Sequence, residues 1–203
     1  MKYLVLLFAI ASISNTAVAQ KVDAAFVVGW SFVSDTKETF GVSPTPFDTI
    51  QTGNHFFLEG AFGWRFVNAH AASLSLDVPI ASIPSQTTSF VGLPGTPGLS
   101  SLFITPGLRL KLLPGSSVSP WVVFGGGWAR YTENGFATNH AAIAYGGGLD
   151  FKTGLPLLGF RAEVRDFVTE DFLNGSIGSV IATNSSGFHH HNVLVGGGVV
   201  LRF

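Results

Sequence analysis

An alternation of apolar residues with polar or small ones recurs in eight segments and restricts the fold of this chain more than any other feature. In segment 21–32 every second residue from Val22 to Phe32 is apolar, and the residues between them include Lys21, Asp23 and Ser31. Successive residues of a strand point to opposite faces, so a period of two predicts a β-strand with one wholly apolar face. The other segments are 55–66, 71–80, 102–112, 121–131, 142–151, 158–167 and 193–203.

The connections between these segments alternate in length. Short turns are expected at 67–70, 113–119 and 152–156, and long connections at 33–52, 81–101, 132–140 and 168–189. Strands of about ten residues cross a bilayer at a tilt, and turns that are short on one side and long on the other are typical of outer-membrane barrels. A strand finds no water in hydrocarbon, so it spans only as part of a closed sheet. The sequence therefore predicts an all-β fold, a closed eight-stranded antiparallel up-and-down transmembrane β-barrel with both termini on the periplasmic side.

The first residues have the pattern of a secretory signal peptide. Lys2 precedes an apolar run, and "AVA" before Gln20 fits a small-residue cleavage site. We expect cleavage after Ala19, so that 1–19 is a signal peptide and 20–203 is a single barrel domain. The chain has no cysteine for a disulfide or a thiolate metal site, and its net charge of −1 with no basic stripe argues against a nucleic-acid partner.

Charged residues make up only 11% of the chain, and the strand frames place nearly all of them opposite the apolar faces. A soluble barrel has the reverse polarity. The lumen of an eight-stranded barrel is just wide enough for side chains to fill it, and charges buried there must pair. We therefore expect a salt-bridged plug, with Asp150 paired to Arg161 and Asp23 to Arg202. The expected lumen network is Asp23, Glu59, Arg65, Asp77, Arg109, Lys111, Arg130, Asp150, Arg161, Glu163, Arg165 and Arg202.

Segment 121–131 is ambiguous in frame because apolar residues occupy both of its faces. Placing Arg130 inside puts Phe124 and Trp128 inside with it. Aromatic residues near strand ends are expected to form girdles at the two membrane interfaces. These residues are Trp30, Phe32, Trp64, Phe66, Trp121 and Tyr131.

The segments "PWVVFGGGWARY", "FRAEVRDF" and "VGGGVVLRF", together with the leader, resemble the family of small eight-stranded outer-membrane β-barrels of the OmpA/OmpX type. The resemblance implies an outer-membrane location in a Gram-negative bacterium. It also implies that the terminal aromatic and the apolar residues at alternate positions before it, Phe203, Leu201 and Val199, form the signal read by the barrel-assembly machinery. The implied partners are outer-membrane lipid, lipopolysaccharide and that machinery, with the mature protein a monomer.

Two further motifs have simpler structural explanations. No helix is expected after the glycine triplets at 125–127, 146–148 and 196–198, so they do not predict a phosphate loop. In "HHHN" only His189 and His191 can face one metal ion, because adjacent strand residues point apart. We expect a polar cluster there, with metal binding as the alternative, and no cofactor.

The function expected from these features is non-catalytic: a structural, adhesion or surface-interaction role with a plugged lumen. The alternatives are a small channel or conduit for hydrophobic compounds and, third, a lipid A-modifying enzyme. Lipid A deacylases in the resembled family use a His-x-Ser pair, which this chain lacks. The long connections are acidic and carry Asp35, Glu38, Asp48, Glu133, Glu170 and Asp171 against Lys37.

Overall fold

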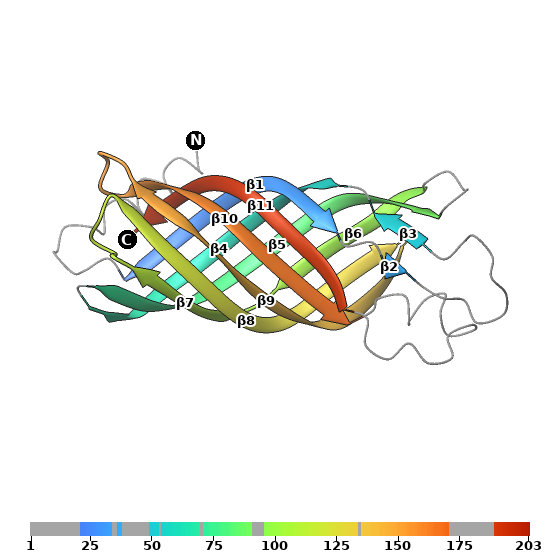
Figure 1. The fold of residues 1–203 in the computed structure, drawn as a ribbon, viewed down its shortest axis with the longest axis horizontal. Coiled ribbons are helices and arrows are strands. Elements are labelled where there is room, and N and C mark those ends of the chain that lie inside the picture. Colours follow the sequence, from blue (N-terminus) through green and yellow to red (C-terminus); the bar gives the residue numbers. More distant parts are fainter. Residues whose placement is uncertain are drawn as a thin grey trace, which may run out of the picture.

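The computed structural model describes residues 21–33, 36–37, 49–52, 54–69, 71–90, 96–133, 135–170 and 189–203 (Figure 1). The strands are β1 (Val22–Val33), β2 (Thr36–Lys37), β3 (Thr49–Thr52), β4 (His55–Asn68), β5 (Ala72–Phe90), β6 (Thr96–Ile104), β7 (Gly107–Leu112), β8 (Val118–Glu133), β9 (Phe136–Lys152), β10 (Leu158–Glu170) and β11 (His189–Arg202). Within those ranges there is no helix long and apolar enough to cross a membrane. The predicted signal peptide lies outside the described residues.

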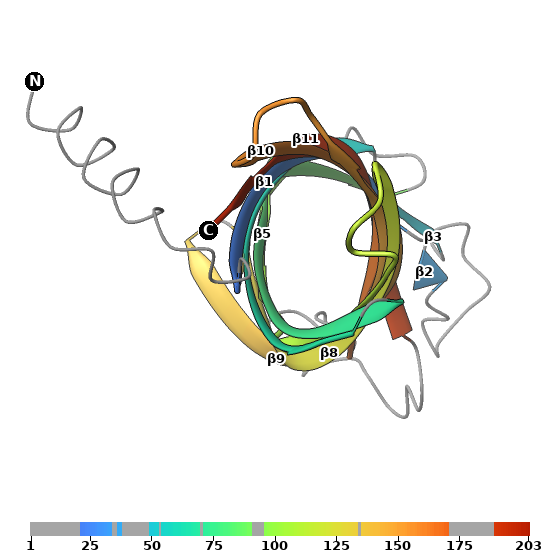
Figure 2. The same cartoon turned by 90° about the vertical axis from the view of Figure 1, so that its left-hand side faces the viewer.

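The strands close into a ring. β6 and β7 lie end to end, because both pair with β5 on one side and with β8 on the other. Counted as one strand, they complete the order β1, β4, β5, β6/β7, β8, β9, β10, β11, and β11 pairs back with β1. The predicted closed eight-stranded antiparallel barrel is thus confirmed, and Figure 2 shows it nearly end-on. β2 pairs with β3, which pairs with the far end of β5.

The connections β4–β5, β7–β8 and β9–β10 lie at one end of the barrel, the short-turn end (left in Figure 1). The first and last strands meet there: the Val22 N–H donates to the Phe203 carbonyl at 3.1 Å, and the Phe203 N–H donates to the Val22 carbonyl at 2.8 Å. The opposite end, where β8 turns into β9, is the loop end.

Two of the predicted long connections are wrong in extent. The connection expected at 132–140 is a tight turn, since β8 runs to Glu133, β9 begins at Phe136, and Gly135 takes a φ of 86° between them. The connection expected at 81–101 is mostly strand, because β5 continues to Phe90 and β6 begins at Thr96. Strand hydrogen bonds do not require an apolar outward face, so pairing continues past the point where the alternation fades.

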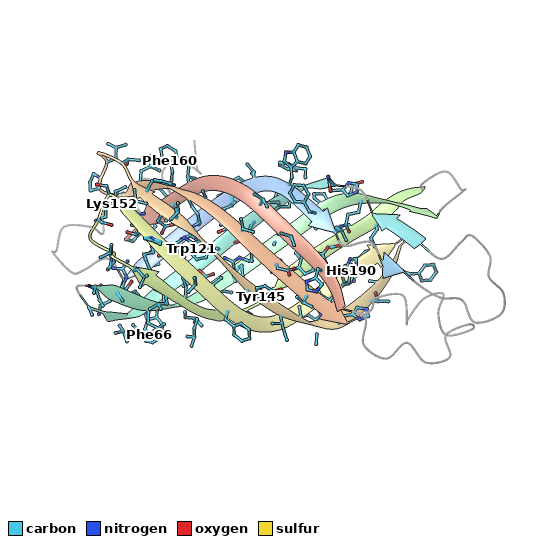
Figure 3. All side chains as sticks on the ribbon, in the orientation of Figure 1. Phe66, Trp121, Tyr145, Lys152, Phe160 and His190 are labelled. Carbon is cyan, nitrogen blue, oxygen red and sulfur yellow. The ribbon has the colours of Figure 1, made fainter. Side chains whose placement is uncertain are left out.

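The outward wall is apolar around the ring. Side chains such as Phe26, Phe62, Ile80, Leu108, Val122 and Phe160 are all at least half exposed there. Trp30 packs edge-on against Phe56 toward the loop end, with ring centroids 6.2 Å apart. Trp64 lies 6.2 Å from Phe66 toward the short-turn end, where Figure 3 shows Phe66 and Phe160 pointing away from the barrel.

The frame chosen for segment 121–131 is wrong. Phe124 is 65% exposed and Arg130 is exposed, so both lie on the outward wall, and Trp128 shares their face. Trp121 and Tyr131, expected in the girdles, are each 2% exposed and point into the lumen. The glycine triplet in the middle of β8 presents no side chain to define a face, so the alternation there is uninformative. Pairing with β9, in which Ser119 lies opposite Asp150, sets the frame.

Candidate functional site

The lumen is the candidate functional site, and it has two chemically distinct parts. The charged plug lies toward the short-turn end, and the aromatic half lies toward the loop end. The charged plug consists of Asp23, Glu59, Asp77, Arg109, Lys111, Asp150, Arg161, Glu163, Arg165 and Arg202, each at most 8% exposed. The aromatic half consists of Val27, Phe57, Ala81, Ile83, Leu99, Phe103, Ala129, Tyr131, Ala142, Ala144, Phe167 and Leu194.

Asp150 on β9 is the hub of one group of charges. The expected pair with Arg161 is present, with Arg161 Nε 2.8 Å from Asp150 Oδ1. Lys111 of β7 donates to the same carboxylate, and Arg202 Nη2 reaches within 3.9 Å of it. The adjacent strand β10 and the strands β7 and β11, each two strands away in the ring, therefore converge on one carboxylate.

Arg109 on β7 links β1 to β5. Its Nη2 lies 2.6 Å from Asp23 Oδ2, and its Nη1 lies 3.0 Å from Asp77 Oδ1. The expected pairing of Asp23 with Arg202 is therefore wrong, although the two residues are opposite each other in the backbone register. The long Arg202 side chain extends toward Asp150 instead, and Asp23 is satisfied from across the lumen.

Arg165 on β10 holds the remaining carboxylates. Its Nη2 lies 3.2 Å from Asp77, 3.4 Å from Glu59 and 3.8 Å from Glu163. Among the described residues, Arg165 is the cation within 4.0 Å of Glu59 and of Glu163, and neither glutamate has a second one. These two acids therefore depend on one guanidinium.

Trp121 lies inside the plug, a position that the sequence frame missed (Figure 3). Its ring faces three guanidinium groups, with Arg161 4.8 Å and Arg109 and Arg165 each 5.9 Å from the ring centroid. Gly148 lies opposite Trp121 in the register, and a Cβ there would fall 2.7 Å from the indole Cζ2. The glycine therefore provides the space for the tryptophan, whereas the predicted frame put Phe124 and Trp128 in the lumen.

The formal charges of the plug are equal in number, because five acidic and five basic side chains are buried in it. Two of the twelve residues expected in the lumen network are not part of the plug. Arg130 is outside the barrel, and Arg65 is only partly buried at the short-turn end. Buried charges that pair in this way fill the cross-section with side chains and leave the plug without a formal net charge.

The aromatic half is packed with rings and contains a small polar cluster. Phe103 lies 4.8 Å from Phe167 and 5.9 Å from Tyr131, measured between ring centroids. The Tyr131 hydroxyl is 2.8 Å from the Thr169 hydroxyl and accepts from Asn192 Nδ2 at 3.3 Å. Phe57 fits beside Gly29 and Gly196, where added Cβ atoms would fall 2.8 and 2.7 Å from its ring.

A titratable cluster lies on the outward wall near the loop end. Asp166 Oδ2 accepts from the Tyr145 hydroxyl at 2.7 Å and lies 2.7 Å from His191 Nδ1. These contacts link β9, β10 and β11. His190 points into the lumen and is 5% exposed, and the side chain of His189 lies outside the described residues. No group of three or more potential metal ligands occurs in the part of the chain that the structure describes.

The residues expected to form the assembly signal follow the alternation of β11. Val199 and Leu201 are exposed on the outward wall, Phe203 is partly exposed, and Arg202 points inward. The charged residues of the predicted long connections cannot be placed. Asp35, Glu38, Asp48 and Asp171 lie outside the described residues, as do the side chains of Glu133, Glu170 and Lys37.

The closed eight-stranded antiparallel ring is the fold of the small eight-stranded outer-membrane β-barrels. The solved structure of Neisserial surface protein A (NspA) is similar, with a TM-score of 0.51 and 10% sequence identity over 90% of this chain and 96% of that one. Outer membrane protein OprG from Pseudomonas aeruginosa has a TM-score of 0.48, at 11% identity over 91% and 97% of the chains. The outer membrane enzyme PagL has a TM-score of 0.43, at 12% identity over 88% and 97%.

No protein-family model matches the sequence. No curated protein matches it either. The similarity to solved structures concerns the fold, and one fold hosts both structural proteins and enzymes. Function has to be argued from the lumen and the walls.

Proposed function

We propose that this chain is a non-catalytic outer-membrane protein with a structural, adhesion or surface-interaction role, and that its charged plug keeps the lumen closed. The observation that carries the proposal is the plug itself. Its ten charged residues are buried, five of each sign, and Trp121 lies among them. A lumen of this diameter has room for the side chains and little else.

The proposed location is the outer membrane of a Gram-negative bacterium, reached by export with residues 1–19 as a cleaved signal peptide. The apolar outward wall and its two pairs of aromatic residues support contact with lipid on all sides. We propose outer-membrane lipid and lipopolysaccharide as the surroundings, the barrel-assembly machinery as the partner during biogenesis, and a monomer as the mature state.

Fractionation tests the location. The full chain, expressed in a Gram-negative host, is expected in the outer membrane as a band whose migration in electrophoresis changes on heating. Recovery as a soluble periplasmic protein would refute the proposal.

Planar-bilayer recording tests the closed lumen against the channel alternative. The unaltered protein is expected to show no large steady conductance. The double variant Trp121→Ala/Arg165→Ala removes two large side chains from the plug and is expected to conduct, whereas Arg130→Ala, on the outward wall, is the control. A steady conductance in the unaltered protein would favour the channel.

Mass spectrometry of lipid A from cells with and without the protein tests the absence of catalysis. Unchanged lipid A is expected. His191 on the outward wall contacts Asp166, and the Tyr145 hydroxyl donates to the same carboxylate. A nucleophile activated by a base would instead donate its hydroxyl proton to the histidine. A modified lipid A that is lost in His191→Ala would overturn the non-catalytic reading.

The assembly signal is tested at the last residue. Phe203→Asp is expected to lower the yield of folded protein in the outer membrane. The matched control is Gly197→Ala, because a Cβ at 197 meets only the Arg161 carbonyl at 3.6 Å, whereas one at 196 would fall 2.7 Å from the Phe57 ring. Equal yields from the two variants would contradict a role for Phe203 in assembly.

A further inference from the structure

The short-turn mouth of the barrel contains one arginine that the plug leaves unmatched. Arg65 follows the inward-facing residues of β4 and is partly buried. Every plug cation has a carboxylate within 4.0 Å, but Arg65 has none among the described residues. Its Nε is buried and lacks a hydrogen-bond acceptor. A donor occluded in this way is costly unless an acceptor reaches it.

A hollow opens beside this arginine. Arg65, Asn68 and Ala69 line it from the end of β4, and residues 113–116 line it from the turn between β7 and β8. The turn is held in shape by hydrogen bonds from the Leu113 N–H to the Ala71 carbonyl at 2.8 Å and from the Ser116 N–H to the Leu113 carbonyl at 3.0 Å. The hollow is therefore formed by ordered backbone.

A second cation lies at the rim of the hollow. Lys152 Nζ donates to the carbonyl of Gly115, one of the lining residues, at 2.7 Å, and Figure 3 shows Lys152 at the short-turn end. Among the described side chains, the carboxylates nearest this end are those of Asp23 and Asp150, which are buried and already paired with plug cations. The described side chains at the mouth thus carry an excess of positive charge.

We propose that this hollow is an oxyanion site that binds a phosphate group, carried by a free phosphate or by a lipid headgroup. The guanidinium of Arg65 offers a planar fork of donors suited to phosphate oxygens, and Lys152 adds a second positive charge. Asn68 supplies an amide donor from the same wall. The site is separate from the plug and does not depend on the role of the loops.

Calorimetric titration of the refolded full chain with inorganic phosphate, in uncharged detergent at low ionic strength, tests the proposal. Saturable binding is expected. Arg65→Gln is expected to weaken it about tenfold, as loss of charged hydrogen bonds implies. Arg65→Glu is expected to abolish it, and Lys152→Gln to weaken it less than Arg65→Gln does. Arg130→Gln removes an equal charge from the outward wall and is the control. Heat-dependent migration verifies the fold of each variant.

A second titration with short-chain phosphatidylglycerol in the same micelles distinguishes the two sources. Binding of both ligands, weakened by Arg65→Gln, assigns the site to free phosphate and headgroup alike. Arg65-dependent binding of the lipid alone assigns it to a headgroup. Absence of saturable binding of either ligand, or equal losses in Arg65→Gln and Arg130→Gln, overturns the proposal. If Arg65→Gln does not fold, Lys152→Gln against Arg130→Gln decides in the same way.

Discussion

The two parts of the lumen are filled by opposite chemistry. In the charged plug every large side chain ends in a charge, except Trp121, whose ring faces three guanidiniums. In the aromatic half Phe57, Phe103 and Phe167 are fully buried, and the Tyr131 hydroxyl belongs to one small polar cluster. Both parts exclude open space by side-chain packing, but they depend on different interactions.

The aromatic half stabilises the barrel, whereas the charged plug mainly closes it. Burying an ion pair costs about as much desolvation as the attraction returns, so a complete plug adds little net stability. Its residues depend on one another, however, because losing one leaves its partners charged and buried. Apolar packing contributes contact by contact, so a small change in the aromatic half has a small cost.

The largest effect is expected from Arg165→Ala. It leaves Glu59 and Glu163 without a described cation within 4.0 Å and lowers the free energy of unfolding by about 3–5 kcal/mol. Urea unfolding of the refolded protein in lipid vesicles measures it, with Arg130→Ala as the control. Adding Glu59→Gln and Glu163→Gln is expected to restore much of the loss. A loss that persists in the triple variant would mean that the plug acts by packing and not by charge.

A smaller loss is expected from Tyr131→Phe in the aromatic half. The change keeps the ring but removes the hydroxyl that contacts Thr169 and accepts from Asn192. Leaving these buried groups short of a partner costs about 2 kcal/mol. The same unfolding assay applies. An effect as large as that of Arg165→Ala would erase the distinction between the two parts.

Phe103→Leu is expected to cost about 1 kcal/mol, because it retains most of the apolar volume and loses ring contacts with Phe167 and Tyr131. The unfolding midpoint should shift slightly, and bilayer recordings should stay silent. Conductance in this variant would show that the aromatic half, and not the plug, closes the barrel.

The smallest effect is expected outside the lumen. Tyr145→Phe removes one hydrogen bond to Asp166 on the outward wall, and the contact between Asp166 and His191 remains. The free energy of unfolding is expected to fall by about 0.5 kcal/mol, and the losses of the lumen variants are compared with this value. A cost above that of Phe103→Leu would identify this cluster as a principal link between β9 and β11.

Much of the barrel could be predicted from the sequence because the alternation is a local property. The faces of β1, β4 and β10 follow directly from which residues are apolar, and the inward direction of Asp150 and Arg161 follows with them. β8 could not be assigned in this way. Gly125–Gly127 interrupts its pattern, tryptophans occur on both of its faces, and only its pairing with β9 decides between them.

Strand length was also beyond the sequence pattern. β5 and β9 extend beyond the apolar part of the outward wall. The alternation ends there because polar residues occur on both faces, but the strand hydrogen bonds continue. The alternation shows only where the outward face is apolar, and the hydrogen-bonded strands are longer than that apolar part.

The closed barrel, its apolar exterior and the kinds of residue inside it could be predicted from local alternation, since they depend on a period of two along each strand. Which charged residues form ion pairs could be seen only in the tertiary structure. Arg109 is 86 residues from Asp23, and Arg165 is 88 residues from Asp77. Their contacts cross the lumen, so they depend on the stagger of the closed sheet and on side-chain length. For that reason Asp23 pairs with Arg109, and its register neighbour Arg202 extends toward Asp150.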